Sequence, residues 1–144
     1  GYVEAERLGK FEEAIDSVSK NYDRFELIAE KLGCFPDAKS PRIFWVGIGG
    51  EISVLQKMKG DLDAVLTPLG YIPEKRDFHP HLTLARLGEM KRKETEQLDR
   101  EIASHESAQF GEWTVQTIDL MQSVLSSAGA KYTLLRSFPF SCKK

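Results

Sequence analysis

The sequence predicts an α+β domain in which an antiparallel sheet carries helices on its outer face. Three observations lead to this prediction. Stretches with apolar residues at helical spacing alternate with stretches rich in branched and aromatic residues. The last two extended stretches follow each other across a short turn, as in a β-hairpin. The 144 residues, 41% of them hydrophobic, suffice for one globular domain with a hydrophobic core, and two lobes can share this chain length.

The first half of the chain reads as a helix followed by two strands. Apolar residues at spacings of three and four predict the helix over residues 4–20. Alternation in FELIAEKLGCF predicts a strand from about residue 25, which ends near the Gly33 and Pro36 region. The apolar stretch RIFWVGIGG, residues 42–50, is typical of a buried strand that ends at two glycines.

The second half reads as helix, strand, helix and then two strands. A helix is expected over 51–67 and a strand over 81–87, HLTLARL. The charged stretch 90–106 has few apolar anchors and predicts a solvated surface helix. The segments 111–126 and 130–140 predict one closing hairpin. Strand, helix, strand, strand is complete in this half, whereas the first half lacks the opening strand of that pattern.

Charge and cysteine content narrow the classes of function and the compartment. The net charge of −2 and pI of about 6.0 give no overall positive field, which argues against a non-specific DNA binder but allows local phosphate binding. No apolar stretch approaches the ~20 residues of a membrane span, and no membrane partner is expected. Cys34 and Cys142 lack metal-ligand spacing. They are interpreted as reduced thiols of a cytoplasmic protein, with a single disulfide as the alternative.

The stretch HPHLTLAR, residues 79–86, combines polar groups that suit phosphate chemistry. Alternate residues of a strand share a face, so His81 and Thr83 are expected to point one way, with Leu82 and Leu84 anchored in the core on the other. Imidazole titrates near neutrality and can give or take a proton at working pH. The Thr83 hydroxyl can hydrogen-bond a non-bridging phosphate oxygen.

Arg86 is a candidate phosphate ligand whose face depends on how regular the strand is. Its guanidinium could hold a phosphate oxygen through charge-assisted hydrogen bonds. In a regular strand, however, residue 86 falls on the leucine side, and it reaches the phosphate only if the strand twists, bulges or ends near Ala85. A surface ion pair is the alternative role. His79 has the parity of the site but precedes Pro80, so a position at the rim is expected.

A single histidine makes only half of a phosphodiesterase site. One group must activate the attacking oxygen and another must protonate the departing one, on opposite sides of the phosphorus. His105 falls in the charged helix and is expected at the surface. A metal site at His79 and His81 lacks a third ligand or a cysteine cluster. On the residues alone, a structural role for His81 in the core or at the sheet edge also stays open.

The segment PHLTLAR resembles the second HxTx motif of the 2H phosphoesterases, most closely the LigT-like RNA 2′,3′-cyclic phosphodiesterases, historically called 2′-5′ RNA ligases. Three other segments, in this order around the motif, also resemble that family. They are GYVEAERLGKFEEAI, the stretch FELIAEKLGCFPDAKSPRIFWVGI, and the closing WTVQTIDLMQSVLSSAGAKYTLLRSFPF. The resemblance covers nearly the whole chain, although HxTx alone is a weak pattern.

This resemblance implies a fold, an activity and roles for residues. The fold would be a single 2H domain over residues 1–144, with two pseudo-symmetric lobes of antiparallel sheet around a central cleft, each lobe supplying one HxTx motif. The first motif would then lie before Gly1. His81 would transfer a proton, Thr83 and Arg86 would bind phosphate, and Phe78 and His79 would lie at the rim.

The implied reaction opens a 2′,3′-cyclic phosphate of RNA or of a nucleotide to a 2′-phosphomonoester, with 2′-5′ ligation as the reverse reaction. It needs no metal and no other cofactor. The expected partners are RNA ends or small cyclic nucleotides, not DNA, and the protein is expected to be a monomer. Two alternatives stay open: a non-catalytic RNA- or nucleotide-binding module, and a 2H phosphodiesterase for a different 2′-5′ or cyclic phosphate substrate.

Overall fold

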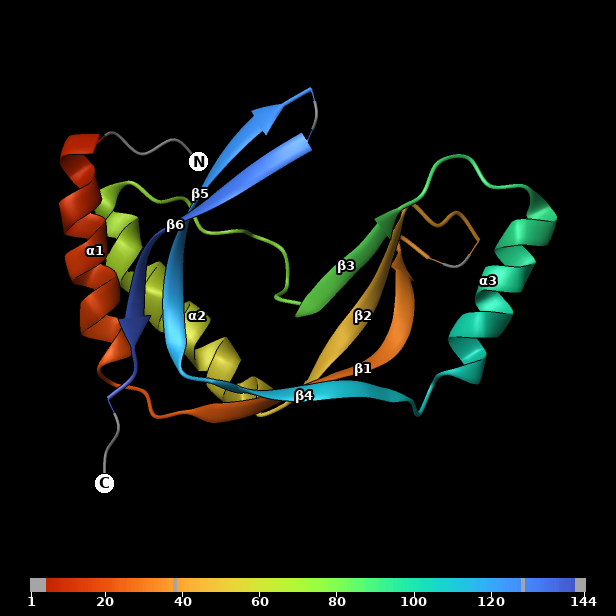
Figure 1. The fold of residues 1–144 in the computed structure, drawn as a ribbon, viewed down its shortest axis with the longest axis horizontal. Helices are drawn as coiled ribbons and strands as arrows, with labels where there is room; N and C mark the ends of the chain where they lie inside the picture. The colour runs from red at the N-terminus through yellow and green to blue at the C-terminus, as the bar shows by residue number, and fades with distance from the viewer. Residues whose placement is uncertain (1–4, 38, 128, 142–144) are drawn as a thin grey trace. The chain divides into compact units, whose positions relative to one another are not determined.

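The helices and strands of the chain lie close to where the sequence predicts them. The computed structural model describes residues 5–37, 39–127 and 129–141. The chain forms two compact units, and each is described by itself. One, called the helical unit, contains α1, α2 and the hairpin β5–β6; the other, called the sheet unit, contains β1 to β4 and α3 (Figure 1). The α+β class and the antiparallel sheets are confirmed.

The helical unit packs two helices with a two-stranded sheet. Its helices are α1, Ala5–Ser19, and α2, Ile52–Leu66, which continues into a short 3-10 helix, Thr67–Leu69. Strands β5, Thr117–Ser126, and β6, Gly129–Pro139, pair antiparallel. The first residue predicted for α1, residue 4, lies outside the described residues, as does Cys142.

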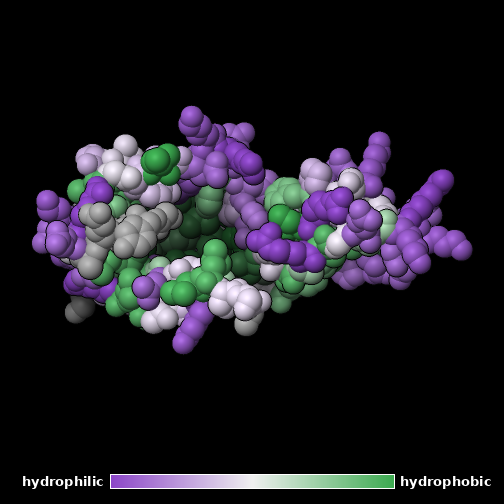
Figure 2. Space-filling view, turned by 90° about the horizontal axis from the view of Figure 1, so that it is seen from above, coloured by the Kyte–Doolittle hydropathy of each residue, from purple (hydrophilic) through white to green (hydrophobic). Residues whose placement is uncertain are grey.

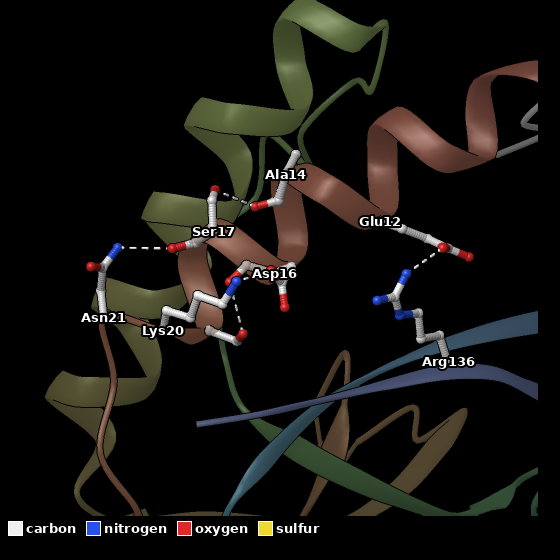
Figure 3. A network of polar contacts seen from close by, with 8 residues as sticks. Glu12, Ala14, Asp16, Ser17, Lys20, Asn21 and Arg136 are labelled. Atoms are coloured by element: carbon white, nitrogen blue, oxygen red, sulfur yellow. Dashed lines mark hydrogen bonds and ion pairs between the residues drawn. The ribbon is translucent and has the colours of Figure 1, made fainter. Parts of the chain in front are cut away.

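The core of the helical unit gathers around the apolar face of α1. Phe138 of β6 is the most deeply buried large side chain there, at 1% exposure. An ion pair also joins these elements, because Arg136 Nη1 of β6 lies 2.7 Å from Glu12 Oε2 of α1 (Figure 3). Spacings of three and four bring one set of α1 side chains to this core. The buried apolar side chains of the unit are Phe11, Ile15, Val18, Tyr22, Phe25, Met58 and Phe138.

The sheet unit is a four-stranded sheet in the order β3-β2-β1-β4 (Figure 1). Its strands are β1, Phe25–Phe35; β2, Ile43–Gly50; β3, His81–Arg86; and β4, Gln109–Val115. The pairs β1–β2 and β2–β3 are antiparallel. The strand that carries the HxTx motif therefore lies at one edge of this sheet, next to β2.

Helix α3, Arg92–Ser104, is the charged surface helix that the sequence predicts. Figure 2 shows hydrophilic side chains gathered over this helix. The Lys91 N–H donates a 2.7 Å hydrogen bond to Glu94 Oε2 and so caps its first turn.

Burial, followed by the nearby carboxylates of Asp37 and Asp99, raises the pKa of the Cys34 thiol. No helix in the described part of the chain is long and apolar enough to cross a membrane.

The prediction of a single strand over residues 111–126 is wrong. The segment breaks at Gln116, so that β4 joins the four-stranded sheet and β5 belongs to the hairpin. The Gln116 carbonyl accepts a 2.9 Å hydrogen bond from the Phe140 N–H, a partner distant in the sequence. No glycine or proline marks the break, so the local pattern carries no signal for it.

Candidate active site

Strand β3 presents His81 and Thr83 on one face of the sheet unit. Residues directly opposite each other on paired strands share a face. His81 lies opposite Gly47, and Thr83 lies opposite Trp45. These four positions form one surface, called the site face below. Thr83 is exposed and His81 is partly exposed, so solvent reaches both side chains.

A bulge in β3 returns Arg86 to the site face. The register shifts by one residue after Thr83, so that Ala85 lies opposite Phe44 and Arg86 opposite Ile43, and Leu84 has no partner on β2. Ile43 and Trp45 are two residues apart on β2 and share a face. Arg86 therefore shares the site face with His81 and Thr83. The regular alternation that would place Arg86 with the leucines does not occur, because the extra residue of the bulge reverses it.

The expectation that Leu82 and Leu84 anchor β3 in the core is wrong. Their side chains are 50% and 54% exposed. Val46, opposite Leu82 on the neighbouring strand, is only 6% exposed. The difference follows from strand order: β2 has a strand on each side, whereas β3 is at the edge of the described sheet.

Four rings form an aromatic cluster on the site face. The Phe35 ring meets the imidazoles of His79 and His81 edge-on, with centroid distances of 5.4 and 5.1 Å. The Trp45 ring lies 5.2 Å from His79, 6.2 Å from His81 and 5.2 Å from Phe35. Edge-on contacts of this length are favourable between aromatic rings. The cluster therefore restricts the orientation of both imidazoles.

A backbone hydrogen bond sets the tautomer of His81. Its Nδ1 lies 2.6 Å from the carbonyl oxygen of His79. A carbonyl can only accept, so Nδ1 carries the proton and donates it. In the neutral ring the lone pair is then on Nε2, which can take a proton as a base and return it as an acid. His79 itself is exposed, and Phe78 is 38% exposed.

Glycines of β1 and β2 let other side chains lie flat on the site face. A Cβ at Gly33 would stand 2.2 Å from the Trp45 ring, and one at Gly49 would stand 2.2 Å from Glu30 Oε1. The Trp45 ring therefore covers Gly33, and the Glu30 carboxylate covers Gly49. The Trp45 Nε1–H is buried and has no hydrogen-bond partner among the described residues.

Glu30 and Phe35 are site-face residues that the sequence reading missed. Glu30 lies opposite Gly47, which in turn lies opposite His81, so the three form a row across β1, β2 and β3. A Cβ at Gly47 would stand 2.9 Å from the Glu30 carbonyl oxygen and 3.4 Å from the Trp45 ring, so the middle of this row is closely packed. The one local hint was IFWVGIGG, where glycines alternate with bulky residues and indicate a close approach of other groups. Within the described residues, no group of three or more His, Cys, Asp or Glu could hold a metal ion.

Comparison with known proteins matches this chain to LigT-like phosphoesterases. A family model described as LigT-like phosphoesterase matches residues 48–132, which include β3. The RNA 2′,3′-cyclic phosphodiesterase of Aeropyrum pernix is 37% identical over 118 residues, 81% of this chain and 65% of that protein. The protein of the same name from Archaeoglobus fulgidus is 35% identical over 138 residues, covering 96% of this chain and 74% of the relative. The chain thus spans about two thirds of the length of these relatives.

A solved structure shows the same fold at lower sequence identity. The crystal structure of Escherichia coli LigT complexed with 3′-AMP matches with a TM-score of 0.67 and 21% identity. The match covers 98% of this chain and 72% of that chain.

Proposed function

This chain belongs to the LigT-like phosphoesterase family, and we propose that it hydrolyses the 2′,3′-cyclic phosphate of an RNA end or a nucleotide to a 2′-phosphomonoester. The observation that carries the proposal is that three functional groups lie on the site face. They are the imidazole of His81, whose tautomer is fixed, the hydroxyl of Thr83 and the guanidinium of Arg86. Two relatives named RNA 2′,3′-cyclic phosphodiesterase support the choice of substrate.

In the proposed reaction a water molecule attacks phosphorus while the bond from phosphorus to the 3′ oxygen breaks. One group takes a proton from the water, and another donates a proton to the departing 3′ oxygen. His81 Nε2 provides one of these two transfers, because its Nδ1 is committed to the His79 carbonyl. The other transfer is assigned to the histidine of the first HxTx motif that the family resemblance implies.

Thr83 and Arg86 are proposed to bind the non-bridging oxygens of the phosphate. The hydroxyl donates a neutral hydrogen bond, and the guanidinium donates charge-assisted bonds that are roughly twice as strong. Arg86 forms no ion pair with the described residues, so its charge is not neutralised by a carboxylate within the structure. In the transition state, negative charge develops on these oxygens, and the Arg86 guanidinium would stabilise that charge.

The type of nucleic acid, the oligomeric state and the cellular compartment are part of the same proposal. A DNA end has no 2′-hydroxyl and cannot form a 2′,3′-cyclic phosphate, so RNA is the expected polymer. We also propose that the two units work as one domain in a cytoplasmic monomer. Size-exclusion chromatography with light scattering checks the oligomeric state.

The test is hydrolysis by the intact protein in the presence of EDTA. Adenosine 2′,3′-cyclic phosphate and a short RNA ending in a 2′,3′-cyclic phosphate serve as substrates, and the 2′-phosphomonoester is identified by 31P NMR. His81→Ala should lower turnover by about 10²- to 10⁴-fold, the usual contribution of a general acid or base. His105→Ala is the matched control, because His105 lies at the end of α3, where its Nδ1 donates to the Glu101 carbonyl.

Two results would contradict the proposal. One is normal turnover by the His81→Ala variant with an unchanged far-UV circular dichroism spectrum. The other is tight binding of 2′-phosphorylated nucleotides by the intact protein without any hydrolysis, which would favour the binding-module alternative.

A further inference from the structure

A polar cavity lies at the end of the sheet unit where β3 finishes. It is formed between the loop that joins β1 to β2 and the segment that joins β3 to α3, and its volume is about 240 Å³. A water molecule occupies roughly 30 Å³ in the liquid, so the cavity has room for a hydrated phosphate group. Side chains that line it include Lys39, Ser40, Arg42, Glu89 and Thr95.

The lining carries cations that are available to a ligand. Lys39 and Arg42 are exposed and form no ion pair within the described residues. Glu89 is an acidic member of the lining. The nearby Asp37 carboxylate lies outside the lining and accepts the N–H groups of Lys39 and Ser40 at 2.8 and 3.0 Å. Two cations against one lining carboxylate favour an anionic ligand.

The cavity adjoins the site face through the backbone. The Leu87 N–H donates a 2.8 Å hydrogen bond to the Arg42 carbonyl, and Arg86 lies opposite Ile43, the residue that follows Arg42. Arg86 is the last residue of β3, and the cavity lining includes Gly88 and Glu89, which follow it closely in the sequence. Arg42 precedes Ile43 and so falls on the other face of β2, which means that an RNA reaches the cavity around the end of β3.

The chemistry of the substrate fixes where the rest of an RNA must be. A 2′,3′-cyclic phosphate uses both hydroxyls of the terminal ribose, so every other nucleotide lies on its 5′ side. The chain therefore leaves the reaction centre in one direction only. With a net charge of −2, the protein offers no general attraction for RNA, and local cations must supply it.

We propose that the RNA leading to the cyclic phosphate passes around the end of β3 and places an upstream phosphate in this cavity, where Arg42 and Lys39 bind it. This inference rests on the proposed function and makes it specific: the substrate is an RNA chain with at least a few nucleotides, not a mononucleotide. Ser40 and Thr95 supply hydroxyl groups at the same cavity.

The test compares substrate length in one charge-neutralising variant and its control. The measured quantity is the ratio of kcat/KM for a six-nucleotide RNA with a 2′,3′-cyclic phosphate to kcat/KM for the matching cyclic mononucleotide. Arg42→Gln keeps the backbone contacts of residue 42 and removes only its charge. Arg100→Gln is the matched control, since Arg100 lies in α3 outside the cavity lining.

We expect a ratio well above one in the wild type, a fall of about fivefold in Arg42→Gln, and a larger fall when Lys39→Gln is added. The slope of log(kcat/KM) against log salt for the RNA should become shallower by about 0.7 for each lost phosphate contact. Arg100→Gln should leave the ratio unchanged. A wild-type ratio near one, or equal effects of Arg42→Gln and Arg100→Gln, would overturn the inference.

A binding measurement separates this inference from the proposed function. Fluorescence anisotropy with a labelled six-nucleotide RNA ending in a 3′-phosphate needs no turnover. If the protein hydrolyses neither substrate but binds this RNA through Arg42, the proposed reaction fails and the RNA path stands. If it hydrolyses both substrates and Arg42→Gln binds the RNA as the wild type does, the reaction stands and the RNA path fails. Binding of inorganic phosphate alone, without any gain from the RNA chain, also rejects the path.

Discussion

Gly33 should be intolerant of even the smallest side chain, because the Trp45 ring occupies the space where a Cβ would be. A Cβ at Gly33 would stand 2.2, 2.3 and 2.7 Å from three carbon atoms of that ring. Carbon atoms prefer separations of about 3.5 to 4.0 Å, so the ring would have to move by more than an ångström. Phe35 and His79 pack against the same ring and resist that movement.

Gly33→Ala should therefore lower the free energy of unfolding by about 1–3 kcal/mol, the usual cost of overpacking. Urea titration followed by tryptophan fluorescence measures this change. Gly111→Ala is the control in the same unit, because a Cβ at Gly111 in β4 meets nothing within 4 Å. That variant should stay within about 0.5 kcal/mol of the wild type, as surface substitutions do. If Gly33→Ala matches the stability of Gly111→Ala, the packing of Trp45 over Gly33 is refuted.

Three further predictions follow from the geometry. Deleting Leu84 should remove the bulge while keeping Arg86 on the site face, so kcat/KM toward a cyclic phosphate should stay within about tenfold of the wild type; complete loss of turnover would refute this reading of the register. Tyr22→Phe removes a 2.6 Å hydrogen bond to Asp61 and should cost about 1 kcal/mol in urea titrations. Burial and that hydrogen bond raise the pKa of Tyr22 above its usual 10.0. The stability that the protonated Tyr22 hydroxyl contributes is therefore fully present below about pH 10 and declines as the pH rises through the raised pKa. The difference between Tyr22→Phe and wild type should therefore shrink in strongly alkaline buffer, and a constant difference would contradict the assignment. Burial and neighbouring carboxylates raise the pKa of Cys34, so iodoacetamide at pH 8 should alkylate it more slowly than a cysteine in an unstructured peptide, as peptide mass spectrometry can measure; an equal rate would count against its burial.

Local periodicity accounts for most of the secondary structure. The helical spacing of apolar residues placed α1, α2 and α3 to within a few residues, because a helix repeats every 3.6 residues whatever it later packs against. The same reasoning predicted that His81 and Thr83 share a face, since strand parity is a property of the backbone. The family resemblance of the segment around His81 was likewise readable from the residues, and the comparisons confirmed the family.

Pairing between distant segments decided what periodicity could not. The sequence by itself predicted which residues of β3 carry the proposed chemistry and determined that two of them point the same way. Only the tertiary structure decided that a bulge at Leu84 brings Arg86 to join them, that β3 is an edge strand with exposed leucines, and that Glu30 lies in one row with His81. The physical reason is that strand order and register depend on the ladder formed with β2, a partner more than thirty residues away. No local pattern in β3 specifies where that ladder slips.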